Sequence, residues 1–195
     1  MNILLYFKKI FRIILMLFFR FDSWHTSPLD NRKYAKDIIS KLNFRESRDS
    51  LIEIGCGLGD ILSKADYERK YFYDISSEVL KAAAFLQKFS KRSSINFFKT
   101  FDLLTNTIDV NLEFDAIVLV NWIHGFESEI INSRLSSIIN NNLNKKGMII
   151  FDIIEDNPSY KFNHDPGDLI DLHKFNITIL DGYPYGRKLI FAELK

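Results

Sequence analysis

The residues of this chain that could bind a ligand gather in one short stretch, 51–60, with the sequence LIEIGCGLGD. Because glycine has no Cβ, Gly55 and Gly57 can adopt positive φ and let the main chain approach a ligand closely, and Gly59 lets a following helix pack tightly. Glu53 lies near the end of an otherwise apolar strand, where a charge is costly unless it meets a donor or a cation. The stretch predicts a buried strand, a ligand-binding turn and one short helix.

A second acid lies at the end of the next predicted strand. The segment 71–75 (YFYDI) predicts a strand that ends with Asp74. A carboxylate at this place can accept hydrogen bonds from the two hydroxyls of a ribose. Two neighbouring strand ends, each with an acid, therefore predict one nucleoside site.

These residues resemble motifs I and II of the class I S-adenosylmethionine-dependent methyltransferases. The family pattern is E/D-x-G-x-G-x-G followed by an acid at the end of the second strand, and every element is present as Glu53, Gly55, Gly57, Gly59 and Asp74. The dinucleotide-binding motif G-x-G-x-x-G would need a glycine where Asp60 stands, so that match fails at one position. A tight connection without a ligand is the structural alternative. The methyl-donor interpretation fits the residues better.

The resemblance implies S-adenosyl-L-methionine as cofactor and a set of residues that bind it. The set is Glu53, Gly55, Cys56, Gly57, Gly59, Asp74, Ile75, Phe101, Asp102, Asn121 and Trp122. Family members often place an acid at the position of Asp102 to bind the adenine amino group, with an apolar neighbour, here Phe101, against the ring. An acid that only caps a turn is the alternative. Asn121 and Trp122 follow the fourth predicted strand. In the family, the methionine end of the cofactor lies next to the substrate at this position.

His124 is the one histidine that the strand order places beside the reactive end of that cofactor. An imidazole titrates near neutral pH, so it could accept the proton of an attacking hydroxyl. We therefore predict His124 as the catalytic residue, with a hydrogen bond inside the loop as the alternative. Methyl transfer can also proceed by alignment of the reacting atoms alone.

Strand-like and helix-like segments alternate along the chain and predict an α/β fold with helices on both faces of the sheet. The resemblance implies a Rossmann-like, seven-stranded sheet, mostly parallel, with a C-terminal antiparallel hairpin. Predicted strands after the first two are 95–98, 114–120, 148–154, 176–180 and 187–192, and predicted helices are 31–42, 76–89 and 127–143. The segment 156–160 (DNPSY) resembles the D/N-P-P-Y signature of amino-group methyltransferases, but it follows the fifth strand, so we interpret it as a loop.

The first twenty residues have a pattern of their own. They contain four cations, Lys8, Lys9, Arg12 and Arg20, and no acid. At about 100° per residue these cations share an arc of about 120°, and most of the remaining helix surface is apolar. The longest run without a charge, 13–19, is far shorter than the ~20 residues that span a bilayer. We predict an amphipathic helix lying in a membrane interface, with packing on the domain or dimerisation as the alternative.

Three segments follow from these patterns: the helix 1–20, a cap or lid 21–48, and a methyltransferase catalytic domain 49–195. In the lid, Trp24, His25, Arg32 and Tyr34 could close the cofactor site, with the arginine on the cofactor carboxylate. The arrangement W-H-x-x-P-L-x-x-R-x-Y-A is similar to small methyltransferases of bacterial surface-polysaccharide biosynthesis.

Composition excludes several classes of function. The chain has 195 residues, 47% of them hydrophobic, and a formal net charge of +1, which does not favour nucleic acid as a partner. Its single cysteine, Cys56, cannot form an internal disulfide and suits a reducing compartment. No cysteine and histidine spacing predicts a metal site, so we expect none. We expect a cytoplasmic protein at the inner face of the membrane.

The sequence thus predicts S-adenosylmethionine-dependent methyl transfer to a small or lipid-linked acceptor, with a sugar hydroxyl in surface-polysaccharide biosynthesis as the specific hypothesis. Two alternatives stay open at this point. One is an NAD(P)-dependent oxidoreductase. The other is a catalytically silent methyltransferase-like adaptor at a membrane.

Overall fold

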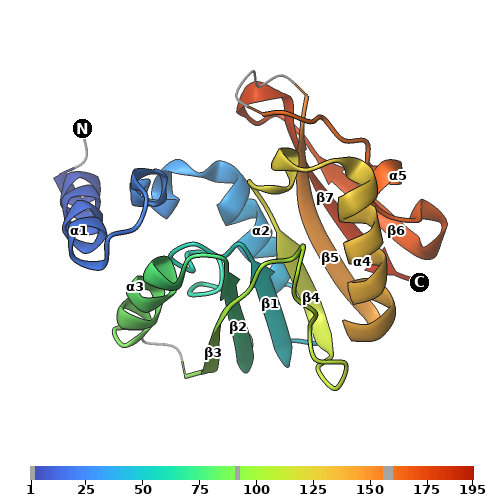
Figure 1. Cartoon of the computed structure of the whole chain (residues 1–195), viewed down its shortest axis with the longest axis horizontal. Coiled ribbons are helices and arrows are strands. Elements are labelled where there is room, and N and C mark those ends of the chain that lie inside the picture. The colour runs from blue at the N-terminus through green and yellow to red at the C-terminus, as the bar shows by residue number, and fades with distance from the viewer. Residues whose placement is uncertain (1–2, 91–92, 156–159) are drawn as a thin grey trace.

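A computed structural model of the chain describes residues 3–90, 93–155 and 160–195, without the side chains of 3–5 (Figure 1). Seven strands form one sheet in the order β3-β2-β1-β4-β5-β7-β6. The strands are β1 Ser50–Ile54, β2 Arg69–Asp74, β3 Ile95–Thr100, β4 Phe114–Leu119, β5 Leu143–Ile154, β6 Phe175–Leu180 and β7 Arg187–Leu194. β1 to β5 are parallel, and β7 is antiparallel to both β5 and β6. The predicted sheet with its terminal antiparallel hairpin is confirmed.

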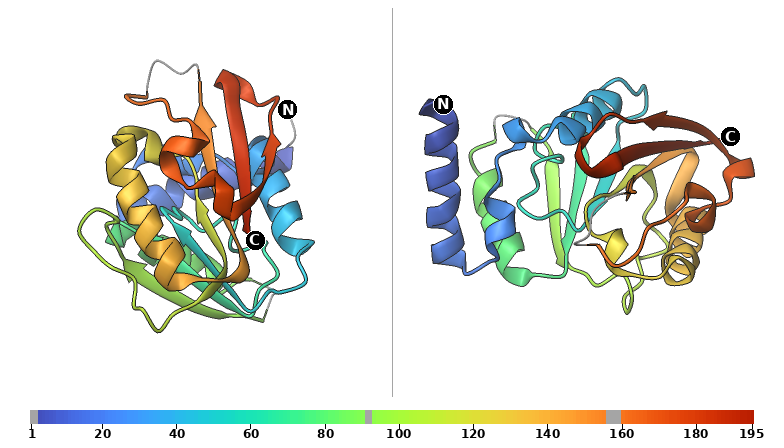
Figure 2. Two further views of the ribbon diagram at one scale, coloured as in Figure 1. Left: turned by 90° about the vertical axis from the view of Figure 1, so that its right-hand side faces the viewer. Right: turned by 90° about the horizontal axis from the view of Figure 1, so that it is seen from above.

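Helices cover both faces of the sheet because successive strand residues point to opposite sides. On one face, Ile52 and Ile117 pack with residues of α4 (Ser128–Asn142). On the other, Leu51 and Val118 pack with α2 (Lys33–Asn43) and with Leu80 of α3 (Ser77–Gln87). The short helix α5 (Pro166–Leu169) lies beside α4. The N-terminal helix, α1 (Ile3–Phe19), lies at one end of the molecule and packs against α3 (Figure 2).

Local signals explain where α3 begins and where β5 begins. The hydroxyl of Ser76 accepts a hydrogen bond from the Val79 amide at 3.2 Å, which caps α3 as the sequence predicts. β5 begins at Leu143 rather than at the predicted Met148, because Leu143 already pairs with Phe114 before a register shift. Within this extension Lys146 has a φ of 64°.

The predicted short helix after the glycine-rich turn is wrong. Residues 55–65 form successive turns, and φ is 75° at Gly55, 55° at Gly57 and 71° at Gly59. After Gly59 the amides of Ser63 and Ala65 donate to the carbonyls of Gly59 and Ile61, but that of Lys64 between them donates to Ile61, so consecutive α-helical hydrogen bonds do not form. A Cβ at Gly59 would lie 2.4 Å from the ring of Phe72, so this glycine allows the turn to pack on β2 and not on a following helix.

Every helix within the described ranges is too short or too polar to cross a membrane. The predicted N-terminal helix 1–20 is observed as α1, and residues 1 and 2 lie outside the described residues. Its polar contacts differ from the expectation. Lys8 pairs with Asp30 at 2.7 Å and Arg12 pairs with Asp60, so two of its four cations face the protein and not a lipid surface.

A buried carboxylate joins the starts of three strands at the edge opposite the glycine-rich turn. Asp115 accepts hydrogen bonds from the amides of Asp49 at 2.8 Å and Ser50 at 3.0 Å, and also from the hydroxyl of Ser47 and the side-chain amide of Asn144. Burial by itself would raise the pKa of Asp115, but the four donors outweigh it and hold the pKa below its usual value.

We expect Asp115→Ala to lower the free energy of unfolding by about 3 kcal/mol, because the buried amide of Ser50 and the part-buried amide of Asp49 lose their acceptor. Urea unfolding at neutral pH measures this change. Glu129→Ala, which removes an exposed carboxylate near the start of α4, is the matched control and should change stability by less than about 0.5 kcal/mol. Equal stability of the two variants would contradict the role of Asp115.

Candidate functional site

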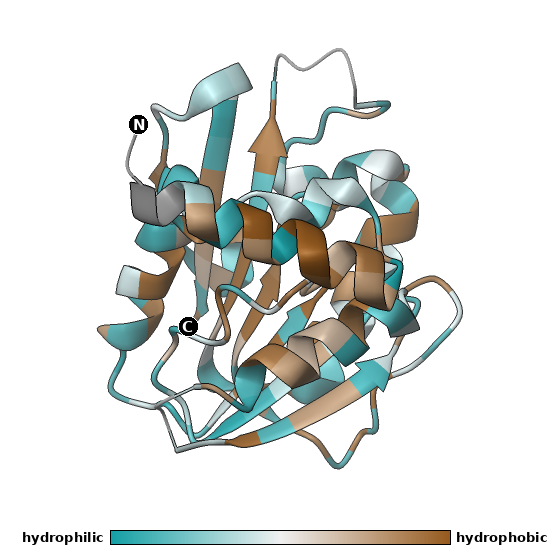
Figure 3. Cartoon of the chain, turned by 90° about the vertical axis from the view of Figure 1, so that its left-hand side faces the viewer, coloured by the Kyte–Doolittle hydropathy of each residue, from teal (hydrophilic) through white to brown (hydrophobic). Residues whose placement is uncertain are grey.

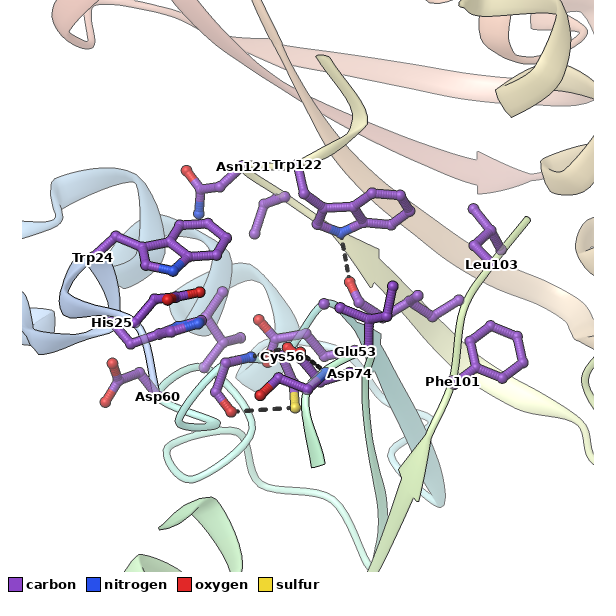
Figure 4. A pocket seen from close by; sticks show the side chains of 18 of the residues that line it. Trp24, His25, Glu53, Cys56, Asp60, Asp74, Phe101, Leu103, Asn121 and Trp122 are labelled. Carbon is purple, nitrogen blue, oxygen red and sulfur yellow. Dashed lines mark hydrogen bonds between the residues drawn. The ribbon is translucent and has the colours of Figure 1, made fainter. Parts of the chain in front are cut away.

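A cavity of about 550 Å³ opens at the carboxyl ends of β1, β2 and β4 (Figure 4). Most residues that the sequence predicts for cofactor binding line it: Glu53, Gly55, Cys56, Gly57, Asp74, Ile75, Phe101, Asp102, Asn121 and Trp122. Gly59 is the exception, since it packs on Phe72 behind the turn. This size and this edge of a parallel sheet are typical of sites for small organic ligands.

The glycine-rich turn is held against β2 by main-chain hydrogen bonds. The amides of Gly55 and Cys56 both donate to the carbonyl of Tyr73, at 2.8 and 3.0 Å. Side chains at the two glycines are excluded, because a Cβ at Gly55 would lie 2.5 Å from the indole of Trp122, and one at Gly57 would lie 2.8 Å from Nδ1 of His25.

The rings of Trp122 and His25 therefore occupy the space directly beside the two glycines. The sequence predicts instead that this main chain lies open to a ligand. Both rings line the cavity themselves, and the indole nitrogen of Trp122 donates to the carbonyl of Ile54 at 2.7 Å. The glycines thus bring two aromatic side chains close to the first strand, with the cavity beyond them.

Asp74 fixes the position of the glycine-rich turn. One carboxylate oxygen accepts a hydrogen bond from the amide of Gly57 at 2.8 Å, and the other accepts from the amide of Ser76 at 3.0 Å. The side chain is buried but lines the cavity. A carboxylate has about four acceptor positions, so Asp74 can still accept hydrogen bonds from a ligand.

Glu53 presents a buried carboxyl group to the same cavity. Its Oε2 atom has no hydrogen-bond partner among the described residues. Burial, and next the negative charge of Asp60, raise the pKa of Glu53 well above its usual value. A cationic group in the cavity would supply the missing partner and favour the ionised carboxylate. Glu53 is therefore suited to bind an ammonium group.

Phe101 and Asp102 line the cavity next to β2. Phe101 is buried, with its ring 5.1 Å from that of Tyr73. The carboxylate of Asp102 accepts hydrogen bonds from the amide of Leu104 at 2.9 Å and the hydroxyl of Thr105 at 3.2 Å, so it caps a turn. Asp102 therefore lines the cavity and also caps a turn, so it combines the predicted position with the alternative. Beside Asp74, Ile75 is largely exposed at the cavity rim.

Cys56 and His124 do not have the geometry of reactive groups. Burial raises the pKa of the Cys56 thiol well above its usual value, which keeps it protonated. His124 is fully buried and is not among the described residues that line the cavity. Its ring lies 4.8 Å from that of Tyr160, and its Nε2 atom lies 3.6 Å from Asp152. In this position His124 cannot contact an acceptor in the cavity, as the predicted general base would have to do.

A polar network that the sequence does not predict lies between the buried His124 and the cavity. Asn121 is at its centre. The main-chain amide of Asn121 donates to the carboxylate of Asp152 at 2.9 Å. Its side-chain nitrogen donates to the hydroxyl of Tyr34 at 3.0 Å, and its side-chain oxygen accepts from Arg187 at 2.7 Å. Arg187 also pairs with Asp152 and stacks on the ring of Tyr34, 4.4 Å from its centre.

Tyr160 lines the cavity at this same end, although the sequence assigns it to a loop away from the chemistry. The other four residues of that predicted loop, 156–159, lie outside the described residues.

One signal in the sequence could have indicated the polar network around Asn121. Asp152 is an acid inside the apolar strand 148–154, where a charge needs a partner.

The lid residues Trp24, His25, Arg32 and Tyr34 all line the cavity. The ring of Trp24 lies 4.5 Å from that of His25. Burial lowers the pKa of His25, so the lid holds this imidazole in its neutral form. Arg32 pairs with the carboxylate of Asp60 in the glycine-rich turn.

Arg12 of α1 connects the lid to that turn. Its guanidinium donates to the carbonyls of His25 at 3.3 Å and Ser27 at 2.8 Å, and it pairs with Asp60. The lid is thus tied to the turn by two arginines that share one carboxylate.

Neither a protein-family model nor a curated protein matches this chain. Its fold matches solved structures of methyltransferases. Magnesium protoporphyrin IX methyltransferase from Synechocystis PCC 6803 with bound S-adenosylmethionine is 16% identical, with a TM-score of 0.64 over 83% of this chain and 78% of that one. N-methyltransferase NodS from Bradyrhizobium japonicum WM9 with S-adenosyl-L-homocysteine is 15% identical, with a TM-score of 0.68 over 84% and 86%.

A further match is an S-adenosylmethionine-dependent methyltransferase from Clostridium acetobutylicum ATCC 824. It is 16% identical, with a TM-score of 0.64 over 85% of this chain and 92% of that one. At these identities the likeness concerns the fold alone. The chain therefore has the class I methyltransferase fold, as the resemblance in its sequence predicts.

We expect Glu53→Gln to stabilise the ligand-free chain by about 1–3 kcal/mol near pH 8, because a buried carboxylate without a partner carries that cost. The sign follows from the raised pKa of Glu53: the folded chain disfavours the ionised form, so the wild type loses stability as pH rises above about 4.5, the usual value. The gain should vanish near that pH. Urea unfolding at both pH values tests this, with Glu129→Gln as the exposed control. A gain that does not depend on pH would contradict the assignment.

Proposed function

We propose that this chain transfers a methyl group from S-adenosyl-L-methionine to a small-molecule acceptor. The observation that supports this most is the pair of acids at adjacent strand ends in one cavity. Asp74 keeps acceptor positions for a ribose, and Glu53 has a buried oxygen without a partner. The solved structures of the same fold with bound S-adenosylmethionine or S-adenosyl-L-homocysteine give further support.

The residues present fit this cofactor. Glu53 would bind its amino group and Asp74 its ribose hydroxyls, while Phe101 and Asp102 would hold the adenine. When bound, the cofactor supplies an electrophilic methyl carbon on a positively charged sulfur. The chain contributes position, and fixed orientation of two reactants accounts for much of the rate in such reactions.

The acceptor would enter at the end of the cavity formed by Asn121, Trp24, Tyr34 and Tyr160. We propose a hydroxyl acceptor on a small or lipid-linked molecule, with a sugar as the specific hypothesis. Aromatic rings beside one amide suit a ligand with apolar faces and polar edges. The proton of such a hydroxyl could be taken up by solvent, because alignment rather than a base is the main requirement.

A cytoplasmic location at the inner face of the membrane is part of this proposal. The unpaired Cys56 is compatible with a reducing compartment. A lipid-linked acceptor would account for a helix that displays large apolar residues on the outside of the domain. Nucleic acid is not an expected partner, since the net charge is only +1.

One observation favours a second candidate, the silent adaptor with this fold. Trp122 and His25 contact the two glycines where a ligand would be expected to approach the main chain. If these rings stay in place, a ligand in the cavity could not reach the main chain of Gly55 and Gly57. Binding and turnover experiments separate this candidate and the oxidoreductase from a methyltransferase.

We expect S-adenosyl-L-homocysteine to bind the full chain with a micromolar Kd in isothermal titration calorimetry, and NAD(H) to give no heat of binding. Incubation with methyl-labelled donor and isolated free or lipid-linked glycans should then move label to the glycan. Tight binding of NAD(H) alone would favour the oxidoreductase. Donor binding without transfer to any acceptor would favour the adaptor.

The two acids should act on different parts of the ligand. We expect Glu53→Gln to weaken S-adenosyl-L-homocysteine by about tenfold or more, the worth of a hydrogen bond between charged groups. Methylthioadenosine has no amino-acid group, so its affinity should not change in this variant. Asp74→Ala should abolish binding of both ligands. Calorimetry with Glu129→Gln as control measures these effects, and equal weakening of both ligands by Glu53→Gln would contradict the assignment of Glu53.

A further inference from the structure

The outward face of α1 is formed by large apolar side chains that are exposed in the described structure. It consists of Tyr6, Phe7, Phe11, Ile13, Ile14, Leu17 and Phe18, and we call it the outer face of α1. Phe7 is 62% exposed, Leu17 69% and Phe18 77%. Figure 3 views the molecule from this side and shows α1 dominated by hydrophobic residues. A patch of this kind on an otherwise folded domain marks an interaction site.

Contacts on the inner face fix the rotation of α1. Leu15 is buried against Val79 and Ala82 of α3, together with Met16 and Phe19. The ion pairs of Lys8 with Asp30 and of Arg12 with Asp60 lie on this same inner side. One side of α1 therefore packs on the domain, and the opposite side is apolar and exposed.

A series of aromatic contacts leads from the outer face of α1 through its inner face to α3. The ring of Phe18 lies 5.0 Å from that of Phe19, which lies 5.9 Å from Phe85, and Phe85 lies 5.3 Å from Phe89. Phe89, at the end of α3, is 70% exposed. Two exposed rings, Phe18 and Phe89, are thus connected by two partly buried ones, Phe19 and Phe85.

We propose that the outer face of α1 docks the chain onto a bilayer that contains anionic lipid, with α1 lying in the plane of the interface. The choice of a bilayer over a second copy of the chain rests on charge. Lys9 and Arg20 are exposed, and the first twenty residues contain no acid. A second α1 would offer these cations no partner, whereas anionic headgroups do.

Docking by this helix would also hold the cavity near the lipid surface. Arg12 ties α1 to the lid at His25 and Ser27 and to the glycine-rich turn at Asp60. If the chain is the methyltransferase proposed above, its acceptor is then a lipid-linked molecule presented at the interface. This step rests on the proposed function, but the docking itself does not.

Sedimentation with lipid vesicles tests the docking without any cofactor. The full chain should pellet with vesicles of phosphatidylcholine and phosphatidylglycerol, and less with phosphatidylcholine alone. Changing Phe7, Leu17 and Phe18 together to serine should lower the vesicle partition coefficient by more than about tenfold. The matched control changes three exposed apolar residues elsewhere, Phe44, Val110 and Ile179, to serine and should pellet as the wild type does.

Two further measurements complete the test. The double change Lys9→Gln and Arg20→Gln should weaken binding to the anionic vesicles by about fivefold for each cation removed. Analytical ultracentrifugation without lipid should show a monomer for the wild type. Equal pelleting of the wild type and the Phe7, Leu17 and Phe18 variant would overturn the proposal. A dimer that this variant disperses would overturn it too and assign the outer face to a second copy.

The outcome is separable from that of the proposed function. Substitutions on the outer face lie away from the cavity, so the variant should keep the wild-type affinity for S-adenosyl-L-homocysteine. Vesicle binding without nucleoside binding would leave the docking in place and remove the enzyme. Nucleoside binding without vesicle binding would do the reverse.

Discussion

The cavity depends on one carboxylate, that of Asp74. Its two oxygens hold the amide of Gly57 in the glycine-rich turn and the amide of Ser76 at the start of α3. The turn needs this hold because its three glycines have left-handed conformations and form no continuous helix. Asp74 therefore joins the turn to the end of β2 and to the start of α3. The same side chain faces the cavity, so the residue that organises the site would also contact a ligand there.

Next to Asp74 the chain buries a second carboxyl group, that of Glu53, whose Oε2 atom has no hydrogen-bond partner among the described residues. The burial of this group destabilises the folded chain when no ligand is bound, and a cationic ligand would remove that destabilisation. Beside the same cavity, Asp60 binds Arg12 from α1 and Arg32 before α2. Segments far apart in the sequence thus meet at one acid. This arrangement connects α1, the segment before α2 and the glycine-rich turn in one set of contacts.

The sequence predicts those features that local residue chemistry requires. Gly55 and Gly57 predict a tight turn, and Glu53 and Asp74 predict acids at two neighbouring strand ends. Their place in one cavity could therefore be predicted from the sequence. The direction of a side chain after a strand could not. His124 follows β4 as predicted, but a short helical turn directs its ring into the core. Likewise Lys8 and Arg12 face the protein because their partners, Asp30 and Asp60, lie far along the chain and are joined to them only by the fold. Arg187 and Tyr160 reach the cavity for the same reason.

A crystal structure of the full chain with S-adenosyl-L-homocysteine tests the central claim most directly. The account predicts density for the nucleoside in the cavity, with its amino group about 3 Å from Glu53 and its ribose hydroxyls at the same distance from Asp74. It also predicts that the rings of Trp122 and His25 leave room for the ligand beside Gly55 and Gly57. A cavity without nucleoside at saturating ligand, with both rings still against the glycines, or a nucleoside bound elsewhere, would contradict it.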